Sequence, residues 1–175
     1  MSNSANKLRI LCFASLFAAL TCIGTFIAVP LPIGYFNLGD VFILVGAFLL
    51  GPVWSAVAAG LGAALADVFM GFAIYAPATF VIKAAVAAIG ATLFTLAAKN
   101  SKTKTLGFFH ALFSALIAEC AMVGGYFLYE SLVLGYGIGA TASLLGNALQ
   151  GVCGALGSAA ICRIIGKYNF FKLNK

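Results

Sequence analysis

The stretch Tyr35–Lys83 reads YFNLGDVFILVGAFLLGPVWSAVAAGLGAALADVFMGFAIYAPATFVIK, and it decides the fold. Two apolar runs meet at Gly51-Pro52, a pair that predicts a turn between two helices. Asp40, Asp67 and Lys83 lie in or against these apolar runs. Ionisable groups are costly in an apolar segment, so they need partners or a polar cavity. We therefore expect this stretch to form one wall of a binding pocket in a membrane protein.

The composition of the 175 residues also indicates a membrane protein. Hydrophobic residues make up 63% of the chain and charged residues 8%, whereas a soluble domain typically carries about 25% charged residues. The apolar runs are rich in Ala, Leu and Gly and lack the alternation of strands, which favours helices over a barrel. The expected fold class is an all-α integral membrane protein, with residues 1–175 forming a single domain.

Six transmembrane helices with short connections are expected from the apolar runs and the residues that interrupt them. The runs cover residues 8–29, 38–50, 52–70, 77–98, 106–129 and 140–165. Residues 30–37 form a linker between the first two helices. Pro77 stands at a favoured first-turn position, because a proline lacks only an N–H that a helix leaves unpaired there.

The positions of the basic residues predict the orientation in the membrane. Nine of the ten Lys and Arg residues lie at or before the start of the first apolar run, in the polar linker 99–105, or at or after the end of the last run. Basic residues concentrate in cytoplasmic segments, so both termini are expected in the cytoplasm of a multi-pass protein of the cell membrane. The same distribution argues against nucleic-acid binding, although the net charge is +6.

Polar residues within the expected helices gather toward the extracellular side. These residues are Asp40, Asp67, Lys83, Glu119, Glu130, Asn147 and Gln150. Asn147 and Gln150 are three positions apart, so they share one face of a helix. This convergence predicts a ligand pocket that opens to the outside of the cell.

Several of the ionisable residues also fit structural roles. Asp67 and Lys83 could form a buried ion pair in which Asp67 orients Lys83. Asp40 fits a cap of the second helix better than a ligand contact. Glu119 is the residue best suited to a ligand amine or ring nitrogen, because only Lys83 could reach a matching depth, and Tyr126 lies one to two turns away on a similar face.

The other candidate contacts have alternatives as well. Asn147 and Gln150 could hydrogen-bond between helices rather than to a ligand. Aromatic residues in the outer loops could stack on a flat heterocycle, or they could anchor the chain at the membrane boundary. These aromatic residues are Tyr35, Phe36, Phe72 and Tyr75.

Motifs of soluble enzymes are missing from the sequence. It contains no GxxxxGK[ST] phosphate loop, no HExxH or GxSxG motif and no Cys/His spacing typical of a metal site. We therefore expect neither an enzyme nor a resident cofactor or metal. Uptake against a gradient would need a partner that hydrolyses ATP, or an ion gradient.

Short segments along nearly the whole chain resemble the substrate-binding S components of energy-coupling factor (ECF) transporters. They are Asn37-Leu38-Gly39-Asp40, Gly51-Pro52, Ala66-Asp67 with Gly71, Tyr75-Ala76-Pro77-Ala78-Thr79 with Lys83, Gly125-Tyr126-Phe127 with Glu130, and Gly146-Asn147-Ala148-Leu149-Gln150. The chain is most similar to the subgroup associated with pyridoxine-like compounds or hydroxymethylpyrimidine.

This resemblance implies a six-helix protein that captures a vitamin outside the cell and docks on a transmembrane coupling (T) subunit driven by two ATPases. The ligand-binding residues would be Asn37, Asp67, Tyr75, Lys83, Glu119, Tyr126, Asn147 and Gln150. Structural or capping positions would be Gly39, Asp40, Gly51, Pro52 and Pro77. In this family an AxxxA stripe on the first helix contacts the coupling subunit, and Ala14 and Ala18 match it; internal packing is the alternative for small residues in this spacing.

Two other functions stay open, the first from the residues alone and the second within the family resemblance. One is an autonomous ion-coupled carrier in which Asp67, Lys83 and Glu119 relay a proton. The other is an S component for a different heterocycle, such as thiamine, riboflavin or a queuosine precursor.

Overall fold

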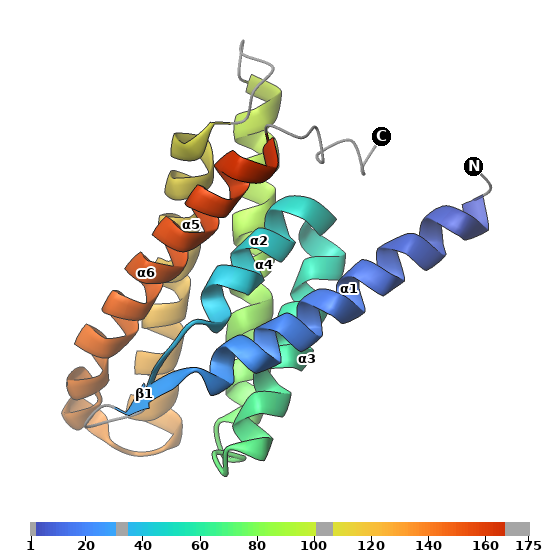
Figure 1. Ribbon diagram of the computed structural model, residues 1–175. Helices are drawn as coiled ribbons and strands as arrows, with labels where there is room; N and C mark the ends of the chain where they lie inside the picture. The colour runs from blue at the N-terminus through green and yellow to red at the C-terminus, as the bar shows by residue number, and fades with distance from the viewer. Residues whose placement is uncertain (1–2, 31–34, 101–106, 167–175) are drawn as a thin grey trace.

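The computed structural model describes residues 3–30, 35–100 and 107–166 and confirms the all-α fold class (Figure 1). The helices are α1 (Asn3–Phe26), α2 (Gly39–Leu50), α3 (Pro52–Phe69), α4 (Ala76–Asn100), α5 (Phe108–Leu128) and α6 (Thr141–Gly166). Strands β1 (Ala28–Pro30) and β2 (Tyr35–Asn37) lie between α1 and α2. A π-helical turn (Tyr129–Val133) and a 3-10 turn (Gly137–Ala140) connect α5 to α6.

Five of the helical segments in the described ranges are long and apolar enough to cross a membrane, whereas α2 is not. Its 12 residues span about 18 Å at 1.5 Å per residue, against a hydrocarbon core of about 30 Å. The expectation of six membrane-crossing helices was therefore wrong for α2. This helix lies inside the bundle instead, where it packs on α1, α3, α4 and α6.

The segment after α1 also differs from the prediction. The first helix was expected to reach residue 29, but α1 ends at Phe26 and β1 begins at Ala28. β1 pairs with β2 in an antiparallel hairpin in which Val29 lies opposite Phe36. β-branched and aromatic residues favour this extended pairing. The Leu38 N–H, 3.1 Å from the Gly24 carbonyl oxygen, ties the hairpin back to α1.

The turn between α2 and α3 lies at the predicted position. Gly51 has φ of +76°, a backbone conformation that favours glycine, and Pro52 is the first residue of α3. Pro77 occupies the first turn of α4. Two of the predicted helix starts thus depend on a proline, for the physical reason given above.

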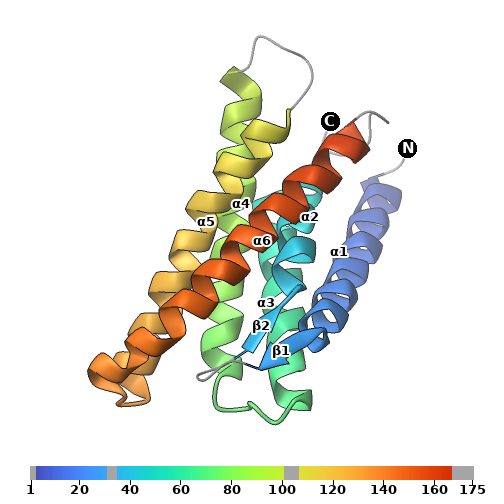
Figure 2. The same cartoon turned by 60° about the vertical axis from the view of Figure 1, so that its left-hand side comes forward.

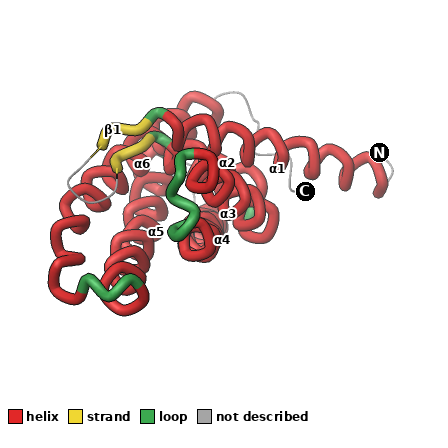
Figure 3. The backbone as a smooth tube through the Cα atoms, turned by 90° about the horizontal axis from the view of Figure 1, so that it is seen from below, coloured by secondary structure: helices red, strands yellow, loops and turns green. Residues whose placement is uncertain are grey.

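The helix ends that flank the basic segments lie at one end of the bundle. In Figures 1 and 2 the start of α1, the end of α4, the start of α5 and the end of α6 are all remote from the hairpin. Figure 3 looks from the opposite end, where β1 and β2 lie beside α6. This arrangement agrees with the predicted common side for the basic segments, while the side that faces the cytoplasm stays a prediction.

The small residues of α1 pack inside the chain. Ala14 is 6% exposed and belongs to a cluster with Phe17, Val45, Leu50 and Ala58, and Ala18 packs against this cluster. A side chain at Gly62 of α3 would collide with the Ala18 carbonyl oxygen, so α1 and α3 are in close contact. Within the chain, internal packing therefore accounts for this stripe, and the expectation that Ala14 and Ala18 contact the coupling subunit stays a prediction.

Candidate ligand-binding site

A pocket lies near the hairpin end of the bundle, among β2, α3, α4, α5 and α6. Its walls are formed by Tyr35, Asn37, Asp67, Phe72, Tyr75, Thr79, Tyr126, Glu130, Asn147 and Gln150. The empty space is about 420 Å³ with the open mouth included, but the centres of water molecules fit into only about 50 Å³ of it. In this form the pocket has room for no more than a few water molecules.

The pocket brings together six of the eight residues that were predicted to bind a ligand. Asn37, Asp67, Tyr75, Tyr126, Asn147 and Gln150 line it, whereas Lys83 and Glu119 do not. Contact of Lys83 and Glu119 with a ligand stays a prediction. Four further residues line the pocket. Tyr35 and Phe72 had been considered only for aromatic stacking, Glu130 only as a polar residue of the outer side, and Thr79 only as part of a family motif.

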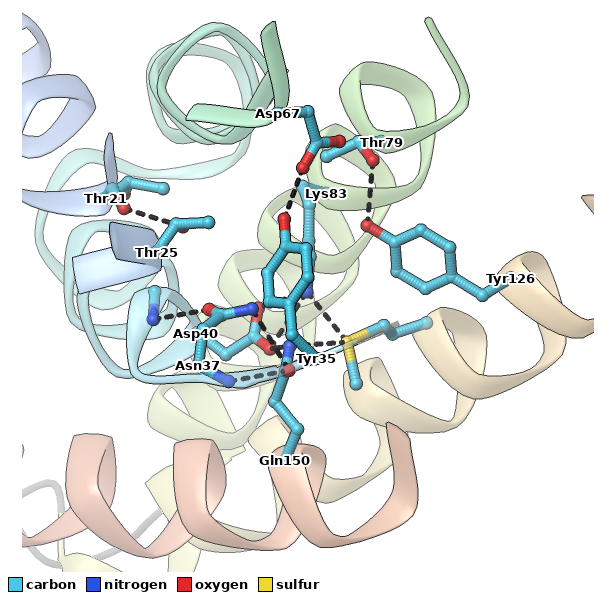
Figure 4. A network of polar contacts seen from close by, with 12 residues as sticks. Thr21, Thr25, Tyr35, Asn37, Asp40, Asp67, Thr79, Lys83, Tyr126 and Gln150 are labelled. Carbon is cyan, nitrogen blue, oxygen red and sulfur yellow. Dashed lines mark hydrogen bonds and ion pairs between the residues drawn. The ribbon is translucent and has the colours of Figure 1, made fainter. Parts of the chain in front are cut away.

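Asp40 is the ion-pair partner of Lys83, and not the cap of a helix. Lys83 Nζ lies 2.6 Å from Asp40 Oδ1 and 2.9 Å from Oδ2 (Figure 4). The first residue before α2, Leu38, makes no side-chain cap. Both charged residues are buried, with 1% of Asp40 and 3% of Lys83 exposed. This pairing also corrects the expectation that Lys83 pairs with Asp67.

Asn37, and not Asp40, forms the side-chain hydrogen bond at the start of α2. Asn37 Oδ1 accepts a hydrogen bond from the Gly39 N–H at 2.8 Å. A Cβ at position 39 would lie 2.9 Å from that same oxygen, so only glycine fits here. The predicted structural role of Gly39 thus has a specific cause in the structure. Asn37 satisfies one of the N–H groups that every helix start leaves unpaired.

Gln150 joins the hairpin to the buried ion pair. Its Oε1 accepts hydrogen bonds from the backbone N and from Nδ2 of Asn37, at 3.0 and 3.1 Å. Its Nε2 donates to Asp40 Oδ2 at 2.6 Å. One amide on α6 therefore holds β2 and α2 together, as Figure 4 shows. The sequence suggested helix-to-helix hydrogen bonding for Gln150, but the partners lie 113 and 110 positions away and no local pattern identifies them.

Lys83 lies behind the pocket wall, in contact with residues around it. Besides Asp40, its Nζ contacts Met122 Sδ at 2.8 Å, and it lies 5.5 Å from the centre of the Tyr126 ring. A lysine ammonium has three donors, and these contacts use them. Lys83 consequently positions Asp40 and, through Asp40, Gln150.

A second group of contacts surrounds Asp67 at the opposite wall. The Tyr35 hydroxyl donates a short hydrogen bond to Asp67 Oδ1, and the Tyr35 ring packs on Phe72 with centroids 5.2 Å apart. Asp67 Oδ2 is buried and has no partner among the described residues. Thr79 Oγ1 and the Tyr126 hydroxyl are 3.0 Å apart (Figure 4). An unpaired carboxylate oxygen at the pocket wall can accept a hydrogen bond from a ligand.

Burial and acidic neighbours raise the pKa of two tyrosines at the pocket mouth. For Tyr35 the causes are desolvation first and then the charge of Asp67. For Tyr75 they are desolvation first and then the charge of Glu130. A raised pKa favours the neutral phenol in both residues. These hydroxyl groups therefore stay hydrogen-bond donors well above neutral pH.

Glu130 lies where α5 changes into a π-helical turn. Such turns occur often at functional sites because they shift the helical register. Glu130 is 3% exposed, and the Ser143 hydroxyl donates a short hydrogen bond to its Oε2. Asp67 and Glu130 are acidic, and the pocket lining contains no Lys, Arg or His. The walls therefore favour ligands that are neutral or basic over anionic ones.

Three comparisons relate this chain to known proteins. The family model described as "ECF-type riboflavin transporter, S component" matches residues 5–172. An uncharacterized protein of Pyrococcus woesei, described only by its place in a gap 3' region, is 30% identical over 148 residues, which are 79% of this chain and 88% of the relative.

Among solved structures, one described as "Structure and mechanism of the S component of a bacterial ECF transporter" has a TM-score of 0.72. It is 21% identical and the match covers 93% of this chain and 98% of the other, so it shows a shared fold. Because the family match extends over almost the whole length, the chain belongs to the ECF-type transporter S component family, whose model carries the riboflavin name, and it is a multi-pass membrane protein.

Proposed function

We propose that the pocket captures a small, neutral or basic, water-soluble heterocycle of the vitamin or vitamin-precursor type. The observation that carries this proposal is the lining itself, which combines aromatic rings with hydrogen-bonding groups from several separate segments of the chain. Tyr35, Phe72 and Tyr75 offer rings that can stack on a flat ligand. Asp67 and Asn147 offer polar side-chain groups. Ligand sites commonly combine such surfaces with a few polar groups.

The size of the pocket favours a pyridoxine-like compound or hydroxymethylpyrimidine. Only about 50 Å³ is open to the centres of water molecules, so even a one-ring ligand requires the aromatic side chains at the mouth to move outward. Riboflavin is the second candidate, favoured by the description of the matching family. Its three fused rings and sugar-alcohol chain would require a larger movement of the same side chains.

A binding assay on the purified chain tests this proposal. Isothermal titration in detergent would measure pyridoxine, hydroxymethylpyrimidine, thiamine, riboflavin and queuine. We expect one ligand to bind, and Asn147→Ala to weaken it about tenfold, because losing one hydrogen bond to a ligand costs about 1–1.5 kcal/mol. Leu145→Ala is the matched control, since Leu145 lies on α6 but is 71% exposed. Binding of none of the five compounds would refute the proposed ligand class.

We further propose that the pocket opens to the extracellular side, because the helix ends next to the basic segments lie at the other end of the bundle (Figure 1). A cysteine placed at the exposed Ile138, beside the pocket end, should react with a membrane-impermeant thiol reagent on intact cells. Reaction only after the cells are opened would reverse this orientation.

The proposed partners are the coupling subunit and two ATPases of an ECF transporter. Of the candidate spans, α1 is the least buried, with 28% of its apolar 18-residue window buried. Ser15 and Ala19 are exposed on α1, one position beyond the buried Ala14 and the half-buried Ala18. This small-residue face leaves room for a close approach of another membrane helix. We assign it, rather than the buried stripe, to the coupling subunit.

A further inference from the structure

Glu119 is a carboxyl group without a hydrogen-bond partner in the middle of the bundle. Only 3% of its surface is exposed. Neither Oε1 nor Oε2 has a partner within the described ranges 3–30, 35–100 and 107–166. Glu119 does not line the pocket. Buried polar groups are nearly always hydrogen-bonded, and each exception needs a physical explanation.

The surroundings of Glu119 are tightly packed. A Cβ at Gly151 of α6 would lie 2.9 Å from Glu119 Cβ, and a Cβ at Gly154 would lie 3.3 Å from Oε1. The same point at Gly154 is 2.8 Å from the Asp40 Cβ. The Glu119 carboxyl group therefore lies beside the Asp40 side chain, against a face of α6 that consists of glycines.

The charged groups that act on Glu119 are Asp40 of α2 and Lys83 of α4. Tyr126, on the same helix, is the remaining titratable neighbour, and α6 contributes Gln150 and the two glycines. Lys83 already directs its N–H groups to Asp40 and Met122. The positive charge of Lys83 is thus matched by Asp40, and an ionised Glu119 would add an unpaired negative charge to an apolar interior. Such a charge is strongly unfavourable.

A metal ion does not fit as the missing partner. Among the described residues no group of three or more His, Cys, Asp or Glu side chains could hold one. A proton requires no further ligands. It removes the excess charge and leaves the neighbouring ion pair intact.

We propose that Glu119 is a proton-binding site, which holds a proton while the Lys83–Asp40 pair is closed. Loss of the proton would place Lys83 between two carboxylates. Asp40 also holds Gln150, and Gln150 holds Asn37 of the hairpin. A weaker Lys83–Asp40 pair would therefore loosen the pocket wall. The proposal does not depend on the identity of the ligand, so it can fail or hold independently of the proposed function.

Infrared spectroscopy of the purified chain tests for this proton. A protonated carboxyl group has a carbonyl stretch that ionised carboxylates lack and that shifts in heavy water. We expect this band in the wild type at neutral pH, a clear loss of its intensity in Glu119→Gln, and unchanged intensity in the control Glu130→Gln. A wild type without the band, or a band of equal intensity in Glu119→Gln, would overturn the proposal.

If Glu119→Gln fails to fold, a pH titration of the wild type followed by infrared spectroscopy still tests the proposal. The carbonyl band of the protonated carboxyl group must disappear as the pH rises. Thermal unfolding supplies a further check. A group that keeps its proton only in the folded state makes the folded form bind more protons, so stability falls as the pH rises. The midpoint of the wild type should therefore decrease relative to that of Glu119→Gln. Two results would contradict a proton at this site. One is that the unfolding midpoints of the wild type and of Glu119→Gln depend on pH in the same way, and the other is that added sodium stabilises the wild type alone.

Discussion

At the scale of single residues, the Lys83–Asp40 ion pair supports the pocket from below. Both side chains are almost completely buried, and Gln150 is attached to Asp40 through a hydrogen bond of 2.6 Å. A buried pair of this kind contributes little net stability compared with apolar residues, but removal of one partner leaves an uncompensated charge. Single variants that remove one charge of the pair and a double variant that removes both charges therefore have different expected effects.

The single variants Lys83→Met and Asp40→Asn should each lower the free energy of unfolding by about 3–5 kcal/mol. The double variant should regain much of this loss, because no unpaired charge remains. Denaturant unfolding in mixed micelles, followed by the fluorescence of Trp54, would measure all four proteins. Losses that simply add in the double variant would show that the two residues do not act as a pair.

The sequence allowed us to predict which residues matter here, but not how they pair. Asp40 was expected at the outer boundary of a membrane-crossing helix, at a depth that suits a cap. In the structure α2 is short and begins well inside the bundle (Figure 1), so Asp40 lies deep enough to meet Lys83. The Asp40–Lys83 pairing depends on how deep α2 lies in the bundle, and no local pattern in the sequence encodes that depth.

At the scale of elements, the long helices were predictable and the hairpin was not. Apolar runs with prolines at their starts define α3 and α4 to within one or two residues of the observed bounds. The strands β1 and β2 have three residues each, too few to show an alternating pattern. The hairpin supplies Tyr35 and Asn37 to the pocket. Both residues were candidate ligand contacts from the sequence, but the strand pairing that holds them there was not predicted.

The glycines of α6 allow this helix to approach α2 and α5. A Cβ at Gly154 would lie 2.8 Å from the Cβ of Asp40, a contact that real Cβ atoms do not make. Gly154→Ala should therefore push α6 away from the ion pair and lower the thermal midpoint. An overpacked core typically costs about 1–3 kcal/mol.

Gly124→Ala is the matched control for this element. Gly124 also lies inside a helix, but a Cβ there would meet nothing within 4 Å. Alanine favours helices over glycine by about 1 kcal/mol, so this variant should be neutral or slightly stabilising. Equal midpoints for the two variants would mean that α6 is not held close by its glycines.

At the scale of the whole molecule, the fold separates ligand capture from the source of energy. The described helices bury one polar cluster near the hairpin end, and the sequence contains no phosphate-loop motif. Membership of the S component family implies that the ATPases belong to other subunits. An autonomous ion-coupled carrier would instead need its own gated path through the bundle, whereas Gln150 of the pocket wall is hydrogen-bonded to the buried Asp40–Lys83 pair behind it.

Reconstitution into lipid vesicles distinguishes an S component that depends on separate ATPases from an autonomous ion-coupled carrier. Vesicles that contain the chain alone should bind the ligand in proportion to the protein and should not accumulate it, even with a proton or sodium gradient. Vesicles that also contain the coupling subunit and two ATPases should accumulate it when ATP is supplied, because binding energy alone cannot drive transport against a gradient. Lys83→Met should abolish accumulation together with binding, whereas Leu145→Ala should retain both. Gradient-driven accumulation by the chain alone would refute the assignment of energy coupling to its partners.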